Sequence, residues 1–273
     1  LKILPADKYP RATKSIDEMI KIIKILIDKG HAYIESDGSV YFDINTFSDY
    51  GKLTRISLKG QKKSERINND DYDKNSPQDF ALWKGWKKED GEIGWNAPWG
   101  KGRPGWHIEC SAMSSENLGN HFDIHCGGVD NMFPHHENEI AQSTCFSGEK
   151  FVNYWLHSEF LLVDGGKMSK SLRNFFTIND LIKKGFTAES IRYQLLAGHY
   201  RTKISFSLNK KQESDKVINR INEFQSSLMD FGAQEIQGDH LPESYYDFVK
   251  AMNDDLNTPK ALAIFHSWMR KEL

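Results

Sequence analysis

The chain has 273 residues, 38% of them hydrophobic, and its 36 Lys and Arg residues nearly balance its 38 Asp and Glu residues. This length and hydrophobic content allow one large or two ordinary domains with a packed core. The nearly cancelled charge excludes a uniformly basic surface, so any contact with nucleic acid must come from a local patch.

The number of cysteines and the length of the apolar segments favour a protein inside the cell. Three cysteines are too few, and odd in number, for a disulfide framework, which favours an intracellular, cytoplasmic protein. No apolar run is long enough to span a bilayer, and the first residues do not form a signal peptide, so we expect no membrane contact. Because the chain does not begin with Met, we also expect a piece of a longer protein.

The first predicted elements form a scaffold. Residues 15–29 predict a helix that ends at Gly30, with Ser15 and Glu18 at the spacing of a capping box. Its apolar residues recur at the helical period: Ile16, Met19, Ile20, Ile23 and Ile27. Residues 32–34 and 39–42 predict two strands joined by a turn at Asp37 and Gly38. Residues 58–77 are polar and charged, which favours a solvated loop.

Five of the seven tryptophans fall between residues 79 and 106, among glycines and prolines that interrupt regular structure: Trp83, Trp86, Trp95, Trp99 and Trp106. We expect most of them to pack in the core. Trp106 is the exception, because a helix that starts there would place Trp106 and Cys110 on one face.

A candidate metal centre follows. Residues 120–126 predict a strand that runs into Gly127, Gly128 and Asp130, an arrangement typical of nucleotide-binding α/β folds. Residues 134–143 predict a helix on which His135 and Glu139 share one face.

Thiolate, imidazole and carboxylate are zinc ligands, so Cys110, His135 and Glu139 are three candidates from two elements. A merely hydrogen-bonded acid-base cluster is the alternative. We expect His136 to face elsewhere, as a contact outside the ligand set or as a helix cap.

A cationic segment comes next, at Lys167, Met168, Ser169, Lys170 and Ser171. It could close over a polyphosphate, although a solvated basic turn is the alternative reading. Residues 177–184 and 187–196 predict helices broken at Gly185, and residues 208–231 predict a longer helix. Basic residues at 200–203 and 210–211 could contact RNA phosphates or simply be solvated helix ends.

Three motifs in this order, at residues 105–113, 133–143 and 167–171, closely resemble the cysteinyl-tRNA synthetase family. The resemblance extends over essentially the whole chain, to residues 254–261. Residues 60–66 differ from the shorter, more apolar stretch expected there. The related cysteine ligase of mycothiol synthesis and an inactive tRNA- or zinc-binding module remain alternatives.

The resemblance implies an α/β fold, with a partial Rossmann-type class I synthetase catalytic domain and an α-helical region after it. It implies an ATP-dependent ligase that activates L-cysteine, with magnesium, and transfers it to tRNA(Cys). It also implies one zinc per chain, held by Cys110, His135 and Glu139, which selects cysteine over serine because a thiolate binds zinc and a hydroxyl does not.

Further roles follow from the same resemblance. Lys167 and Lys170 would be catalytic, within an ATP-phosphate loop that includes Met168, Ser169 and Ser171. Trp106 would be a wall of the cysteine pocket, and Gly127, Gly128 and Asp130 would lie near the adenosine. We expect a monomer.

The resemblance also implies a division of the chain. Residues 1–95 would be a connective insertion and crossover, and residues 96–175 the second half of the catalytic domain. Residues 176–235 would be a helical stem-contact region, and residues 236–273 the start of a helical tRNA-binding domain. The family's first half-domain, with the fourth zinc ligand and a His-Ile-Gly-His motif, should precede Leu1, so we expect this chain alone to be inactive.

Overall fold

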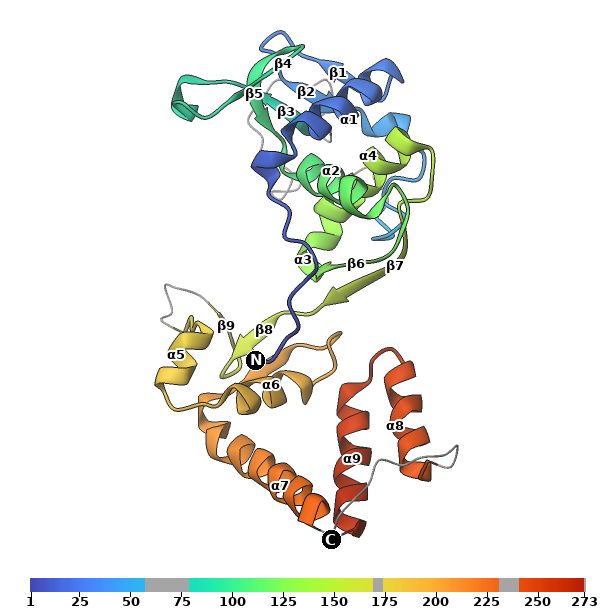
Figure 1. Cartoon of the computed structure of the whole chain (residues 1–273). Helices are drawn as coiled ribbons and strands as arrows, with labels where there is room; N and C mark the ends of the chain where they lie inside the picture. Colours follow the sequence, from blue (N-terminus) through green and yellow to red (C-terminus); the bar gives the residue numbers. More distant parts are fainter. Residues whose placement is uncertain (57–78, 169–173, 231–240, 273) are drawn as a thin grey trace. The chain divides into compact units, whose positions relative to one another are not determined.

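The computed structural model describes residues 1–56, 79–168, 174–230 and 241–272 (Figure 1). The chain divides into two compact units. We call Ala6–His157 the N-terminal unit, and Leu1–Pro5 together with Ser158–Leu273 the C-terminal unit. Among the described residues, no helix combines the length and apolarity needed to cross a membrane.

The N-terminal unit contains an antiparallel sheet with strand order β1-β2-β3-β5-β4. The strands are β1 (Ala32–Ile34), β2 (Val40–Phe42), β3 (Phe80–Gly85), β4 (Trp95–Ala97) and β5 (Gly100–Pro104). Helix α1 (Ile16–Asp28) contributes the apolar stripe read from the sequence to a core that also contains Val40, Phe42 and Trp83. The predicted helix and both predicted strands are therefore confirmed.

The predicted capping box at the start of α1 is wrong. The Ser15 side chain makes no cap hydrogen bond. Its hydroxyl instead donates to Glu116 Oε2 at 2.9 Å, 101 residues along the chain. A tertiary partner has thus replaced the local one that the spacing predicted.

The second half of the N-terminal unit carries the candidate site. Its elements are α2 (Trp106–Leu118), β6 (Phe122–Gly128), α3 (Val129–Asn131), α4 (Glu137–Ser147) and β7 (Val152–Ser158), and β6 pairs with β7. The predicted helix at 134–143 is present in two parts. A π-helical turn, Met132–His136, precedes α4. The helix is interrupted there because the backbone of Phe133 is extended rather than helical.

Short 3₁₀ turns connect these elements: η1 (Ala12–Lys14), η2 (Ile44–Thr46) and η3 (Lys88–Asp90). Buried residues of α1, α2 and α4 join one apolar cluster with β2 and β3, and this cluster includes Ile108, Ala112 and Ala141. The two helices that carry the candidate ligands are thereby packed against a common core.

The C-terminal unit begins with a three-stranded sheet of β8 (Leu161–Val163), β9 (Gly166–Lys167) and β10 (Ile204–Phe206). Strand β8 is central, antiparallel to β9 and parallel to β10. Helices α5 (Ile178–Lys183) and α6 (Ala188–Leu196) each begin with a capping box, and Gly185 lies between them at φ +83°. The predicted break at Gly185 is confirmed.

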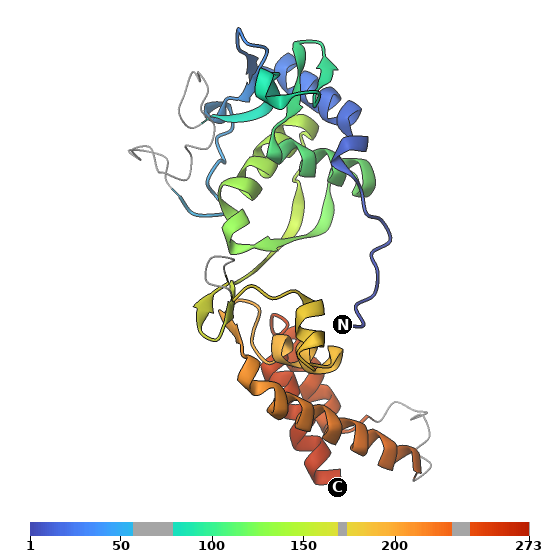
Figure 2. The same cartoon turned by 90° about the vertical axis from the view of Figure 1, so that its left-hand side faces the viewer.

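Three longer helices complete this unit: α7 (Lys211–Asp230), α8 (Glu243–Asn253) and α9 (Thr258–Glu272), with the turn η5 (Leu208–Lys210) before α7. Helices α8 and α9 pack side by side as a hairpin (Figures 1 and 2). The amino terminus is tied into the same unit, because Arg192 Nη1 donates to the carbonyl oxygens of Leu1 and Lys2 at 2.9 and 2.8 Å.

Candidate functional site

The structure brings together the three candidate metal ligands. Cys110 lies in the first turns of α2, His135 in the turn before α4, and Glu139 in the first turn of α4. One ligand atom from each lies within 4.8 Å of the others. His135 and Glu139 are buried and Cys110 is half-buried. That these residues hold a metal ion stays a prediction.

His135 is oriented by aromatic and imidazole neighbours. Its Nε2 lies 2.8 Å from Glu139 Oε1, and its Nδ1 lies 2.8 Å from Nδ1 of His107. The Trp106 ring stacks on His135 at a centroid distance of 4.3 Å. With Nδ1 engaged by His107, Nε2 is the nitrogen presented to Cys110 and Glu139, which is how a histidine ligand is commonly oriented.

The Glu139 carboxylate shows how well these residues suit a cation. Its side chain is fully buried, and neither oxygen has a hydrogen-bond partner among the described residues. Its close neighbours are His135 Nε2 at 2.8 Å and His125 Nε2 at 3.4 Å, in directions that do not make hydrogen bonds. Because an uncompensated buried carboxylate is costly, a divalent cation among sulfur, nitrogen and oxygen donors would remove that cost.

The Cys110 thiol is protonated in the absence of a cation. Burial, reinforced by the negative charges of Glu139 and Glu109, raises its pKa to about 12. A thiolate at this position therefore requires a nearby positive charge, and binding a metal ion there would release a proton.

A second histidine cluster lies beside Glu139. His136 Nδ1 lies 2.7 Å from His157 Nε2, and His125 packs edge-on against His136. His125, His136 and Glu139 also have ligand atoms within 4.8 Å of one another. As expected, His136 does not belong to the group that contains Cys110.

The His136 and His107 imidazoles are neutral at physiological pH. Burial first, and then the neighbouring histidines, lower the pKa of His136 to about 3. Burial, His135 and Lys84 lower the pKa of His107 to about 3. Uncharged imidazole is the form that binds metals and relays hydrogen bonds.

No pattern in the sequence indicated a role for His107, His125 or His157. The only signal for the first two was their position, one residue after Trp106 and two residues before Gly127. His157 lies on β7, far from any motif, and only the pairing of β6 with β7 reveals its place.

Polar contacts fix the start of α4. The fully buried Glu137 carboxylate accepts hydrogen bonds from the Gly51 amide at 3.0 Å, and from the amide and hydroxyl of Thr54 at 2.8 and 2.9 Å. The Tyr50 hydroxyl donates to Asn138 Oδ1. Residues 137 and 138, which lie between the two candidate ligands in sequence, are therefore held by residues 50–54.

The other side of α4 is bonded to α2. Gln142 Nε2 donates to the His107 carbonyl oxygen at 2.6 Å and to Ser111 Oγ at 2.7 Å. The Ser143 hydroxyl donates to Ser111 Oγ at 2.9 Å. These bonds set the spacing between the helix with Cys110 and the helix with Glu139.

Gly127 and Gly128 are the last two residues of β6, and packing against the His136 ring requires a glycine at position 127. A Cβ added at Gly127 would lie 2.5 Å from Cε1 of His136, and one at Gly128 would lie 2.3 Å from Oδ1 of Asp130. Their predicted place near an adenosine, with Asp130, stays a prediction.

The cationic segment is described only at its base. Lys167 is the last residue of β9, and Asn174 Nδ2 donates to its carbonyl oxygen at 2.9 Å. Met168 follows it, whereas Ser169, Lys170 and Ser171 lie outside the described residues. Residues 60–66 also lie outside them.

The tryptophan prediction is confirmed except at Trp86, which is 40% exposed rather than packed in the core. Trp83 is fully buried in the core, whereas Trp106 is 55% exposed beside the candidate ligands. Trp95 and Trp99 pack against the core from its edge.

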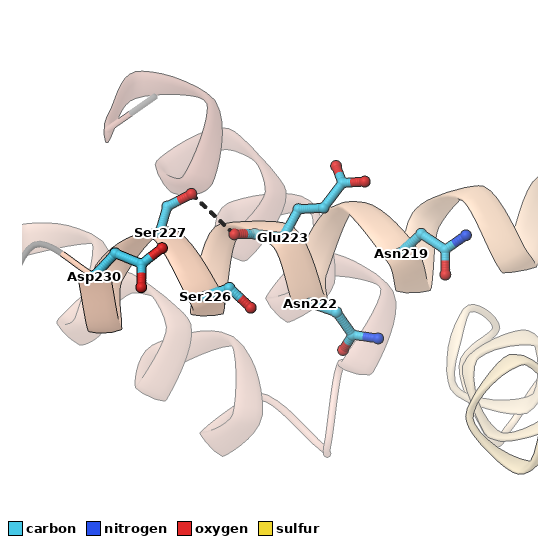
Figure 3. Close-up of a pocket in the computed structure, with 6 residues that line it drawn as sticks. All are labelled: Asn219, Asn222, Glu223, Ser226, Ser227 and Asp230. Atoms are coloured by element: carbon cyan, nitrogen blue, oxygen red, sulfur yellow. Dashed lines mark hydrogen bonds between the residues drawn. The ribbon is translucent and has the colours of Figure 1, made fainter.

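A polar hollow of about 410 Å³ lies along α7 (Figure 3). Six side chains of that one helix line it, and its hydrogen bond runs within the helix, from the Ser227 hydroxyl to the Glu223 carbonyl oxygen. Because no second element of the described residues contributes a lining side chain, we assign no site there.

Solved structures share the fold of this chain. The chain superposes on a methionyl-tRNA synthetase from Mycobacterium tuberculosis in complex with methionyl-adenylate, with a TM-score of 0.60 and 11% identity. The match covers 96% of this chain and 64% of that one. A putative arginyl-tRNA synthetase from Campylobacter jejuni matches with a TM-score of 0.55 and 14% identity, over 98% of this chain and 57% of that one. The fold is therefore that of a class I aminoacyl-tRNA synthetase, as predicted.

The family follows from sequence models. Residues 1–234 match the model described as tRNA synthetases class I (C) catalytic domain, and residues 247–271 match the DALR domain. The chain belongs to the family of class I (C) tRNA synthetase catalytic domains, which confirms the resemblance found in its motifs.

Curated relatives agree with this family. The chain is 50% identical over 277 residues to a cysteine–tRNA ligase of Chlamydia muridarum, and 49% identical over 278 residues to one of Brachyspira hyodysenteriae. Each match covers 99% of this chain but 58% of the relative, so the chain spans little more than half the length of these proteins.

Proposed function

We propose that this chain is the part of a cysteine–tRNA ligase that recognises the cysteine side chain and contributes to the ATP site. The observation that carries the proposal is the Cys110, His135 and Glu139 group, with its buried carboxylate lacking hydrogen bonds, in a chain 50% identical to a curated cysteine–tRNA ligase. In the reaction, the carboxylate of L-cysteine would displace pyrophosphate from ATP to give cysteinyl-adenylate, and a hydroxyl of tRNA(Cys) would then take the cysteinyl group with release of AMP.

Three residues would hold one zinc ion, namely Cys110, His135 and Glu139. When bound there, zinc would supply a soft Lewis acid that favours the substrate thiolate over the hydroxyl of serine. Such a site adds selectivity where an apolar pocket alone would discriminate poorly between two near-isosteric amino acids.

The protein's own side chains would orient the substrate. Trp106, exposed at the edge of the group and stacked on His135, would form one wall for the cysteine. His107 would hold the His135 ring through the Nδ1 contact. Because the cysteine carboxylate is itself the nucleophile toward the α-phosphate of ATP, positioning would carry the chemical step.

ATP would be bound with magnesium. Lys167 and Lys170 would neutralise the charge that develops on the departing pyrophosphate, with Met168, Ser169 and Ser171 in the same loop. Gly127, Gly128 and Asp130 would lie near the adenosine.

The wider organisation belongs to the same proposal. Residues 1–95 would be the connective insertion and crossover, 96–175 the catalytic half-domain, 176–235 the stem-contact region and 236–273 the start of the tRNA-binding helices. A cytoplasmic monomer fits this role.

The test is isotope exchange between pyrophosphate and ATP. It is measured on the longest form of the protein that can be expressed with this chain in it. We expect exchange that depends on cysteine and that serine does not support at equal concentration. Exchange supported equally by serine, or by another amino acid in place of cysteine, would overturn the proposal. A Trp106→Ala variant should raise KM for cysteine more than KM for ATP.

A further inference from the structure

The turn between α8 and α9 is held in an unusual backbone conformation. Asp255 and Leu256 are consecutive non-glycine residues at φ +55° and +53°. Asp tolerates this left-handed region through its short polar side chain, but Leu rarely adopts it. Such a conformation persists only where the surroundings determine it, and it often marks a functional contact.

Asp255 forms hydrogen bonds with the segment between α6 and β10. Its carboxylate accepts hydrogen bonds from Arg201 Nε at 2.5 Å, from Arg201 Nη2 at 3.2 Å and from the Tyr200 hydroxyl at 2.6 Å. These bonds, led by that from Arg201, hold the pKa of Asp255 below its usual range. A bidentate pair between an arginine and a carboxylate fixes the orientation of the two groups as well as their distance.

The backbone of the same turn is held too. His199 Nε2 donates to the Asp255 carbonyl oxygen at 3.0 Å, while His199 Nδ1 accepts from the Arg201 amide at 3.2 Å. The Thr258 hydroxyl, at the start of α9, donates to the Gly198 carbonyl oxygen at 3.4 Å. The α8–α9 turn therefore contacts residues 198–201 through both side chain and main chain.

Residues 199–201 are tied in turn to the β8–β9 hairpin. The Glu159 amide, just before β8, donates to the Tyr200 carbonyl oxygen at 2.8 Å. Strand β10 then runs parallel to β8, pairing Ile204 with Leu161 and Phe206 with Val163.

The tip of the hairpin is bonded to β10 as well. The Asp164 amide donates to the Phe206 carbonyl oxygen at 2.9 Å, the Gly165 amide to Ser205 Oγ at 2.9 Å, and the Ser207 hydroxyl to Asp164 Oδ1 at 2.7 Å. Strand β9 ends at Lys167, the first residue of the cationic motif. Hydrogen bonds and short stretches of main chain therefore connect Asp255 to the hairpin that ends at Lys167.

We propose that Asp255 is a positioning residue, which clamps the α8–α9 helix pair to residues 199–201 and thereby sets the position of the β8–β9 hairpin and Lys167. This inference rests on the proposed function for the meaning of Lys167, because only that function places ATP there. In the ligase, binding of tRNA to the helix pair would then change the position of Lys167, which the proposed function places near ATP.

The test uses two neighbouring aspartates in the whole chain. Asp255→Asn removes the charge while keeping a residue that tolerates positive φ, and Asp255→Gly removes the side chain without straining the turn. Asp254→Asn is the matched control, because it changes the same charge one residue earlier, at φ −89°. Hydrogen exchange of the Asp164 and Gly165 amides is the readout.

We expect both Asp255 variants to raise exchange at Asp164 and Gly165 about tenfold, and Asp254→Asn to change it less than about twofold. The melting temperature and the exchange of α1 amides should not change. Faster exchange confined to α8 and α9, with an unchanged hairpin, would overturn the inference and leave Asp255 a local structural residue.

Steady-state kinetics distinguish a failure of this inference from a failure of the proposed function. If cysteine-dependent exchange of pyrophosphate is present, Asp255→Asn should raise KM for ATP several-fold and leave KM for cysteine unchanged. An equal effect on both constants would count against positioning. If the longest expressed form of the protein shows no such exchange while the hairpin amides still respond, the proposed function fails and the clamp stands.

Discussion

Glu137 gives the sharpest test of how the candidate site is built. Its carboxylate is fully buried and accepts three hydrogen bonds from Gly51 and Thr54. Replacement by Ala leaves the Gly51 amide buried without an acceptor, at a cost of about 1–3 kcal/mol, whereas half-buried Thr54 can recruit water. Loss of the buried Cγ methylene group adds about 0.8 kcal/mol.

We therefore expect Glu137→Ala to lower the free energy of unfolding by about 2–4 kcal/mol. Glu137→Gln should cost about 1–2 kcal/mol, because its NH₂ group must face a donor. Six of the seven tryptophans lie in the N-terminal unit, so tryptophan fluorescence during urea unfolding reports on this unit.

The exposed Glu149, which follows α4 by two residues, provides the control. Glu149→Gln should change stability by less than about 0.5 kcal/mol. A loss below about 1 kcal/mol for Glu137→Ala would refute the reasoning, since it would mean that residues 50–54 do not hold the first turn of α4.

Two further predictions concern the histidine cluster. Gly127→Ala should destabilise the N-terminal unit in urea unfolding, because its Cβ would lie 2.5 Å from the His136 ring, and unchanged stability would contradict that packing. In metal-free protein, the pKa of His136 is lowered to about 3, so the unfolded chain binds the additional proton and stability should fall as the pH drops from about 6.5 toward 3. His136→Asn should flatten that part of the stability profile, and an unchanged slope would show that another group carries it.

The sequence predicted well wherever the cause is local. The period of Ile16, Met19 and Ile23 located α1, and the i, i+4 spacing of His135 and Glu139 placed both on adjacent turns. Trp106 and Cys110 also fall on one helix as expected.

Tertiary partners account for what the sequence did not predict. Ser15 bonds to Glu116 rather than capping its own helix, because that partner appears only after folding. The contacts of Glu137 with residues 50–54 and of His136 with His157 likewise join segments that no local pattern connects. Asp255 falls in residues 254–261, which only the family resemblance marked, because the partners of its side chain lie more than 50 residues away in sequence.

The central claim is that Cys110, His135 and Glu139 form a zinc site, and metal content of the purified chain tests it most directly. The three cysteines supply matched variants, because Cys110 belongs to the group whereas Cys126 is exposed and lies outside it. We expect about one zinc per chain in the unaltered protein and in Cys126→Ser, and none in Cys110→Ser. Equal zinc content in all three proteins would contradict the account.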